Sequence, residues 1–319
     1  MVEGTEAWPY DLTGTSDGRF LATITSDDAP VDRSKQLLDV VDVATATKHR
    51  VASDSSLAPP IWLRDGRLLY AVRTDLYTYD PRTTATKLFY AGQHEQWLTP
   101  VVGSQRVLVA DGADLVLIDA TTGAATTVLN RSSHAPPYVL SADDAEVAFN
   151  DVPDPRRGED RHLMTLDIAD GSVTEHGAAR RADPLWDGQG GWLWNALVGN
   201  DDEVWSSSSS PGHAVVGTGF RAVTVVPGNR VVLTGDGATV SVSDVSGSDR
   251  RLLASQSELL AVGGTRLALL QGGDRDPVVA CAMDVDDVAP RRLATPTNNL
   301  RPNETEITDD GQTVAMFFG

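Results

Sequence analysis

The chain has 319 residues, and its 45 acidic side chains outnumber its 26 Lys and Arg, which gives a formal net charge of -19 at pH 7. This charge argues against nucleic acid or an anionic membrane as a partner, because both are bound by clustered positive charge. The single cysteine, Cys281, excludes a disulfide within the chain.

The N-terminal stretch Met1 to Glu6 is polar and acidic, and no apolar run reaches the length of a membrane span. We therefore expect neither a signal peptide nor a transmembrane segment, and a cytoplasmic location by default. Asp greatly outnumbers Glu, and the lysines are only Lys35, Lys48 and Lys87. Such an acidic surface stays hydrated where salt screens charge repulsion, which predicts a halophilic, high-salt source. The alternative is a GC-rich genome with many Asp-Gly turns.

A short pattern, a turn rich in Asp and Gly followed by an apolar strand, recurs along the chain at intervals of roughly 40–45 residues. The expected first strand residues are Phe20, Leu68, Val107, Val147, Trp192, Val231, Leu267 and Val314. This period, with about four short strands per unit, is typical of a β-propeller. We predict an all-β fold: a β-propeller of seven to eight four-stranded antiparallel blades, the last blade incomplete, forming a single domain over residues 1–319.

The strands within a repeat follow from the alternation of apolar and polar residues between Gly, Asp and Pro turns. In the second repeat they are expected at 60–62, 67–72, 76–80 and 87–90. In the fifth, Val204 to Ser206 runs into further serines, which predicts an irregular outer edge. In the eighth, strands are expected only at 304–307 and 313–318. Either the last blade has two strands, or Val2–Tyr10 adds one, or a partner chain completes it. The propeller has seven blades if one of the eight repeats is not a true blade.

An aspartate closes the expected third strand of six repeats, just before a turn. Its side chain can accept hydrogen bonds from the backbone of that turn, so we interpret these residues as turn caps rather than catalytic groups. They are Asp42, Asp80, Asp119, Asp167, Asp244 and Asp284.

The stretch Pro60-Ile61-Trp62-Leu63-Arg64-Asp65-Gly66, followed by an apolar strand, resembles the repeat of TolB-like and WD-repeat-like propellers. Pro184 to Gly188 matches it loosely, and the His and Trp-Asp marks of strict WD repeats are missing. The same repeat builds the propeller domain of prolyl-oligopeptidase-like peptidases, whose additional α/β-hydrolase domain has no room here. The resemblance implies a fold and not an activity.

Several motifs could suggest chemistry. Gly14-Thr15-Ser16-Asp17-Gly18 matches the Gly-x-Ser-x-Gly nucleophile elbow, but it lies in an expected hairpin rather than a strand-to-helix turn, so we interpret it as coincidence. The six histidines lack metal-ligand spacing, although a propeller axis could assemble distant residues. We predict no catalytic residue, no metal and no cofactor. Aspartate clusters at 27–32, 151–160 and 284–287 could bind calcium but read more simply as solvated acidic loops.

Two neighbouring tryptophans of the fifth repeat, Trp192 and Trp194, lie two apart on one strand and therefore face the same way. We expect them in the core. The alternative is a stacking platform for sugar rings.

The connection between the second and third strands is longer in the first, fourth and seventh repeats than in the others. In a propeller these connections emerge on the same face as the blade-to-blade crossovers, so they would decorate one surface and mark a binding face. Drift in tolerant surface loops is the alternative. The candidate binding-face residues are Asp28, Asp32, Arg33, Asp154, Arg156, Arg157, Asp160, Arg161, Asp274 and Arg275.

The expected function is that of a non-enzymatic propeller scaffold that binds another protein, as a subunit of a larger assembly. The first alternative is a propeller enzyme, a polysaccharide lyase or a lactonase-like hydrolase, with an axial metal or carboxylate site. The second is a carbohydrate-binding adhesin or virion surface module with a glycan partner. Neither nucleic-acid binding nor membrane insertion is expected.

Overall fold

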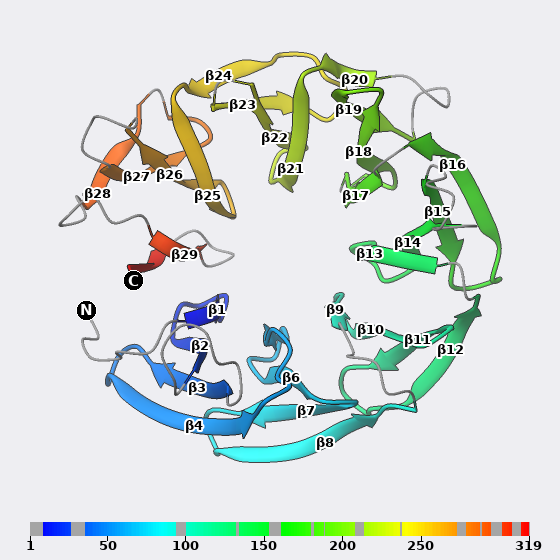
Figure 1. Cartoon of the computed structure of the whole chain (residues 1–319), viewed down its shortest axis with the longest axis vertical. Helices are drawn as coiled ribbons and strands as arrows, with labels where there is room; N and C mark the ends of the chain where they lie inside the picture. Colours follow the sequence, from blue (N-terminus) through cyan, green and yellow to red (C-terminus); the bar gives the residue numbers. More distant parts are fainter. Residues whose placement is uncertain are drawn as a thin grey trace.

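The strands form a ring of antiparallel sheets in a computed structural model of the chain (Figure 1). The structure describes residues 9–26, 36–93, 100–131, 134–152, 161–179, 182–187, 189–207, 214–236, 238–272, 279–287, 289–294, 302–307 and 314–318. All regular secondary structure in these segments is β. Within them, no helix has the length and apolar character needed to cross a bilayer.

Each of the first four sheets contains four strands in sequence order, paired antiparallel. The first holds β1 (Pro9–Gly14), β2 (Phe20–Ser26), β3 (Gln36–Asp42) and β4 (Thr47–Asp54). The second holds β5 (Ile61–Trp62), β6 (Leu68–Val72), β7 (Asp75–Asp80) and β8 (Ala85–Ala91). The third holds β9 (Pro100–Val102), β10 (Arg106–Asp111), β11 (Asp114–Asp119) and β12 (Ala125–Asn130). The fourth holds β13 (His134–Leu140), β14 (Glu146–Asp151), β15 (Arg161–Asp167) and β16 (Val173–Ala179).

Three more four-stranded sheets follow the same order. The fifth holds β17 (Ala182–Trp186), β18 (Trp192–Val198), β19 (Asp201–Ser206) and β20 (Ala214–Thr218). The sixth holds β21 (Phe220–Val226), β22 (Arg230–Gly235), β23 (Thr239–Asp244) and β24 (Arg251–Ala254). The seventh holds β25 (Ser257–Gly263), β26 (Arg266–Gln271), β27 (Val279–Asp284) and β28 (Arg291–Ala294).

The last sheet pairs β29 (Pro302–Ile307) with β30 (Val314–Phe318). It completes the circle, because β29 lies against both β25 of the seventh blade and β1 of the first. The predicted propeller is confirmed: seven blades have four strands, and the described part of the last sheet has two. Of the stretch Val2–Tyr10, Pro9 and Tyr10 belong to β1 of the first blade instead of adding to the last sheet, and the remainder lies outside the described residues.

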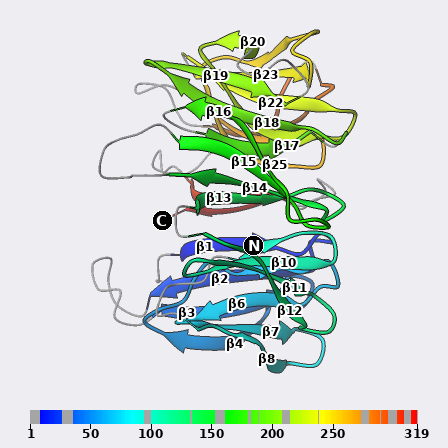
Figure 2. The same cartoon turned by 90° about the vertical axis from the view of Figure 1, so that its right-hand side faces the viewer.

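The core lies between neighbouring blades, whose strands are stacked in layers in the side view of the ring (Figure 2). The second strands of the seven four-stranded blades are mostly covered on both faces, so they read as apolar runs; Leu68, Leu69, Tyr70 and Ala71 of β6 are all buried. The outer strand β8, in contrast, is mostly exposed. Complete burial of one leucine contributes roughly 1.5–3 kcal/mol, so a blade is stabilised mainly by its neighbours.

The six aspartates that close the third strands cap the turns that follow, as predicted. The Oδ1 atom of Asp119 accepts hydrogen bonds from the amides of Thr121 and Thr122 at 3.0 and 2.7 Å. Equivalent bonds from a turn amide are made to the carboxylates of Asp42, Asp80, Asp167, Asp244 and Asp284. The bonds from Thr122 hold the pKa of Asp119 below its usual value, so it stays ionised as a cap.

The fifth blade departs from this pattern, as expected from its serines. Ser207, beyond the end of β19, exchanges hydrogen bonds with the backbone of Trp192, its amide donating at 2.8 Å and its hydroxyl accepting at 2.9 Å. A serine side chain therefore takes over a pairing position next to β18.

Candidate functional site

The antiparallel order gives the ring two different faces. The turn face carries the connections from first to second strands and from third to fourth strands. The loop face carries the connections from second to third strands and the crossovers between blades. The long connections of the first, fourth and seventh blades join β2 to β3, β14 to β15 and β26 to β27, and all leave the loop face.

Most of the predicted binding-face residues lie outside the described residues. These are Asp28, Asp32, Arg33, Asp154, Arg156, Arg157, Asp160, Asp274 and Arg275. Arg161 is described: it is the first residue of β15, half-buried, and is paired in register with Ala179 of β16. The binding role of this set therefore stays a prediction.

A partly buried polar cluster lies where the long connection of the fourth blade leaves β14, and no motif in the sequence pointed to it. The Nδ1 atom of His134 is 2.8 Å from the Tyr138 hydroxyl, and the two rings meet edge to face. Arg131 forms an ion pair with Asp151, whose side chain is only 5% exposed. His134 and Asp151 are register partners on β13 and β14. The four side chains thus support the point where the chain leaves β14 for the residues 152–160.

The electrostatics of this cluster follow from burial. Burial lowers the pKa of His134, so its imidazole is neutral at neutral pH. Burial also raises the pKa of Tyr138 to about 12. The sequence signal for this pair was that His134 and Tyr138 lie four residues apart. Because the strand has a bulge between them, this spacing does not determine how the two side chains lie.

The nucleophile-elbow match is a hairpin turn, as predicted. Ser16 lies exposed in the turn between β1 and β2, and a strand rather than a helix follows it. Asp17 is occupied within the same turn: its Oδ1 accepts bonds from the Thr15 hydroxyl at 2.7 Å and from the Arg19 amide at 3.1 Å. The motif thus provides turn capping rather than an activated serine.

A pocket of about 470 Å³ lies on the turn face between the first two blades. Thr13, Gly14 and Ser16 of the first blade line it, together with 61–64 of the second. The Trp62 indole Nε1 donates to the carbonyl of Thr13 at 3.2 Å, which links the two inner strands and fixes the ring. Phe20 stacks on Trp62 with ring centroids 6.3 Å apart.

The remaining histidines are dispersed. His162 lies 2.7 Å from Glu175, and the Nε2 atom of His176 lies 2.9 Å from the Thr165 hydroxyl. His49 is exposed on β4, and His94 and His213 fall outside the described residues. In the part of the chain that the structure describes, no three His, Cys, Asp or Glu side chains gather in a way that could hold a metal ion.

The tryptophans of the fifth blade pack in the core, as expected. Trp192 and Trp194 are 2% and 1% exposed, so neither can serve as an open stacking platform. Trp186 meets Trp192 edge to face at 4.9 Å, and Trp205 meets Trp194 at 5.9 Å. Cys281 is a buried residue of β27.

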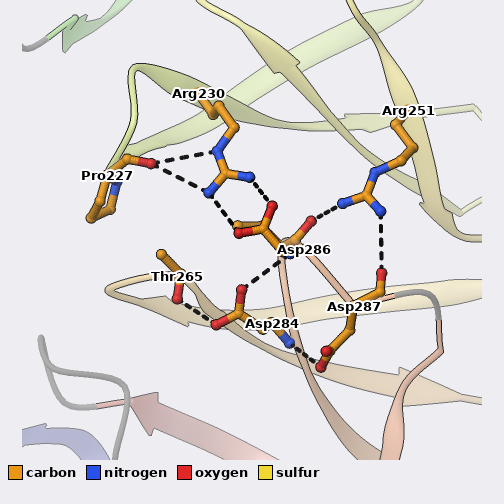
Figure 3. A network of polar contacts seen from close by, with 8 residues as sticks. Pro227, Arg230, Arg251, Thr265, Asp284, Asp286 and Asp287 are labelled. Atoms are coloured by element: carbon orange, nitrogen blue, oxygen red, sulfur yellow. Dashed lines mark hydrogen bonds and ion pairs between the residues drawn. The ribbon is translucent and has the colours of Figure 1, made fainter.

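On the turn face, side chains link one blade to the next. Between the sixth and seventh blades, Arg230 at the start of β22 pairs with Asp286, and the bond lowers the pKa of Asp286 (Figure 3). Arg251 at the start of β24 donates to the carbonyls of Val285 and Asp287. The third-to-fourth-strand turn of the seventh blade is thereby held by two arginines of its neighbour.

A second link of this kind joins the third and fourth blades. The Asp144 carboxylate accepts bonds at 2.7 Å from the amide of Ser104, from the hydroxyl of Ser104 and from the amide of Gln105. Asp144 has a φ of 58° and is 4% exposed. A Cβ added at Gly103 would lie 1.9 Å from its Oδ1, so the approach of the two turns requires glycine there.

No model of a protein family matches the chain, and no curated protein matches it by sequence. Solved structures do match. An oligogalacturonate lyase from Vibrio parahaemolyticus is 11% identical, with a TM-score of 0.58 over 99% of this chain and 88% of the lyase. A prolyl endopeptidase is 12% identical, with a TM-score of 0.61 over 92% of this chain, which spans 51% of that enzyme. TolB from Acinetobacter baumannii is 12% identical, with a TM-score of 0.47 over 86% of this chain and 79% of TolB.

At these identities the likenesses concern the fold alone. The lyase and the peptidase confirm, at that level, the propeller resemblance expected from Pro60 to Gly66. Only about half of the peptidase is spanned, so its activity does not transfer with its propeller.

Proposed function

We propose that this protein is a propeller scaffold that binds another protein through the loop face, as a subunit of a larger assembly. The observation that carries the proposal is the difference between the two faces. Connections on the turn face are capped by their own aspartates and bonded to the next blade. These contacts engage the named turn-face connections within the ring.

On the loop face, the connections differ in length from blade to blade. The second-to-third-strand connections span only 73–74, 112–113, 199–200 and 236–238 in the second, third, fifth and sixth blades. They span 27–35, 152–160 and 272–278 in the first, fourth and seventh. Chain added on one face of a rigid scaffold is the usual way in which repeat proteins build a binding surface.

The composition of the long connections supports a protein partner. They carry Arg33, Arg156, Arg157 and Arg275 in a chain of net charge -19. Arginine is enriched in protein interfaces, because its guanidinium combines apolar stacking with fixed hydrogen-bond geometry. The polar cluster of His134 and Asp151 lies at the end of β14, where the connection 152–160 begins.

The test is quantitative capture with matched charge variants. Tagged wild-type protein is compared with R156E/R157E and with R291E/R292E, a pair exposed on the outer strand β28 that undergoes the same change of charge. We expect a partner recovered by the wild type and by R291E/R292E but lost by R156E/R157E. Equal recovery or equal loss by the two variants contradicts the assignment of the loop face.

Elemental analysis separates this proposal from an axial metalloenzyme. We expect the purified protein to carry less than stoichiometric metal. One tightly bound metal ion per chain, retained through gel filtration, would contradict a purely binding role.

A further inference from the structure

We propose that the pocket between the first and second blades binds a small ring compound that carries one carboxylate group. The pocket lies on the turn face, away from the surface assigned to the protein partner, so this site is independent of the proposed function. Its volume of about 470 Å³ falls in the usual range of small-molecule sites.

The charge at the pocket comes from Arg64. Its side chain is exposed and lines the pocket, and among the described residues nothing pairs with its guanidinium. The arginines around it are engaged: Arg19 lies 3.7 Å from Asp42, and Arg67 bonds to Asp65. Arg64 is therefore a positive charge available to a ligand.

The acidic groups beside the pocket do not compete for that charge. Hydrogen bonds from Thr15 and Arg19 lower the pKa of Asp17, whose Oδ1 accepts both of those bonds. Asp65 accepts bonds from the Arg67 amide at 3.0 Å and from Arg67 Nε at 2.7 Å. Both carboxylates are thus directed into their own turns.

The wall of the pocket favours a flat ring. The Trp62 indole is held on one side by Phe20 and at its Nε1 by the Thr13 carbonyl, so its orientation is set before any ligand arrives. A ring can stack on an indole, and a carboxylate can take two parallel bonds from a guanidinium. Ser16, on the opposite blade, also lines the pocket.

A single carboxylate fits better than a multiply charged anion. Only one unpaired arginine lines the pocket in the described residues, and the protein as a whole carries a net charge of -19. Each further negative charge on a ligand is repelled by the acidic protein, and among the described lining residues there is no second arginine to pair with it.

The indole N–H of Trp62 provides a local readout by NMR of the ¹⁵N-labelled protein, assigned through its loss in W62F. Two monoanionic probes, D-glucuronate and benzoate, are titrated beside their neutral amides. We expect at least one acid to shift the Trp62 signal saturably, with its amide at least tenfold weaker. A response to glucuronate alone identifies sugar acids, and a response to benzoate alone identifies aromatic acids.

The matched variants are R64Q and R73Q. Arg73 belongs to the same blade but lies on the loop face, where it is 3.7 Å from Asp54. R64Q should weaken the responding acid at least tenfold while leaving the spectrum of the rest of the protein unchanged, and R73Q should have no effect. The proposal is overturned if neither acid moves the Trp62 signal, if amide and acid bind equally, or if both variants weaken binding alike.

Discussion

Removing the Asp144 carboxylate should loosen the junction of the third and fourth blades. D144A takes away the acceptor for two backbone amides and one hydroxyl. Each lost bond to a charged group costs about 1.5 kcal/mol at the low end, so the two amides account for about 3 kcal/mol. Alanine must also adopt the left-handed conformation with φ near 58°, which costs about 1 kcal/mol more. We expect a total loss of about 4 kcal/mol.

Amide hydrogen exchange under native conditions measures this at the right place. The amides of Ser104 and Gln105 should lose about that much free energy of opening in D144A. D144N keeps the shape and tolerates the left-handed conformation, so about 1–2 kcal/mol should be lost. D143A is the control, because Asp143 caps only its own turn through Ser141 and Ala145.

The reasoning is refuted by either of two results. One is unchanged protection of the Ser104 and Gln105 amides in D144A. The other is an equal effect of D143A on those two amides, which would mean that the turn rather than the inter-blade bond determines their protection.

Three further changes are expected. Hydrogen bonds lower the pKa values of Asp17, Asp244 and Asp286, so these carboxylates stabilise the fold above the unfolded value near 4, and this contribution is lost as the pH falls through the lowered folded values. Tm should therefore be level near neutral pH and fall below about pH 4; a fall already at pH 6 would point to histidines instead. N195A should lower stability by about 2–4 kcal/mol in denaturant titrations, because the Asn195 amide bonds both the N–H and the C=O of buried Ala222 in the next blade, at 2.6 and 2.7 Å. N195D should be no more stable than N195A, because its carboxylate repels the Ala222 carbonyl. An unchanged stability of N195A would contradict this role of Asn195. Finally, with a net charge of -19, Tm should rise steadily as KCl is raised toward molar concentrations, and a salt-independent Tm would argue against a halophilic protein.

Strand positions were predictable from the sequence because local turn chemistry determines them. Phe20, Leu68, Trp192 and Val314 begin β2, β6, β18 and β30, as expected, and the other four anchors fall one residue inside their strands. Asp and Gly specify a hairpin through positive φ and side-chain capping, and both act within a few residues. The alternation of the flanking strands then follows.

Contacts between blades were not predictable in the same way. Asp143 and Asp144 are adjacent in one turn, yet the first caps that turn and the second bonds to the preceding blade. Likewise, Trp62 was recognisable as part of a repeat motif, but its bond to the Thr13 carbonyl depends on how two sheets pack. The pocket and the cluster at His134 arise from such packing, so no local pattern identified them.

Every sheet in the described residues is built from strands that are consecutive in the sequence. Among the described residues, no backbone pairing joins the first sheet to the last, and the circle is completed where β29 lies against β1 and β25. Such a join resists separation less than a shared sheet does, since it can part without breaking a ladder of hydrogen bonds. Local opening of the ring should start at this junction. The amides of β29 and β1 should therefore be the first whose hydrogen exchange becomes faster in mild denaturant.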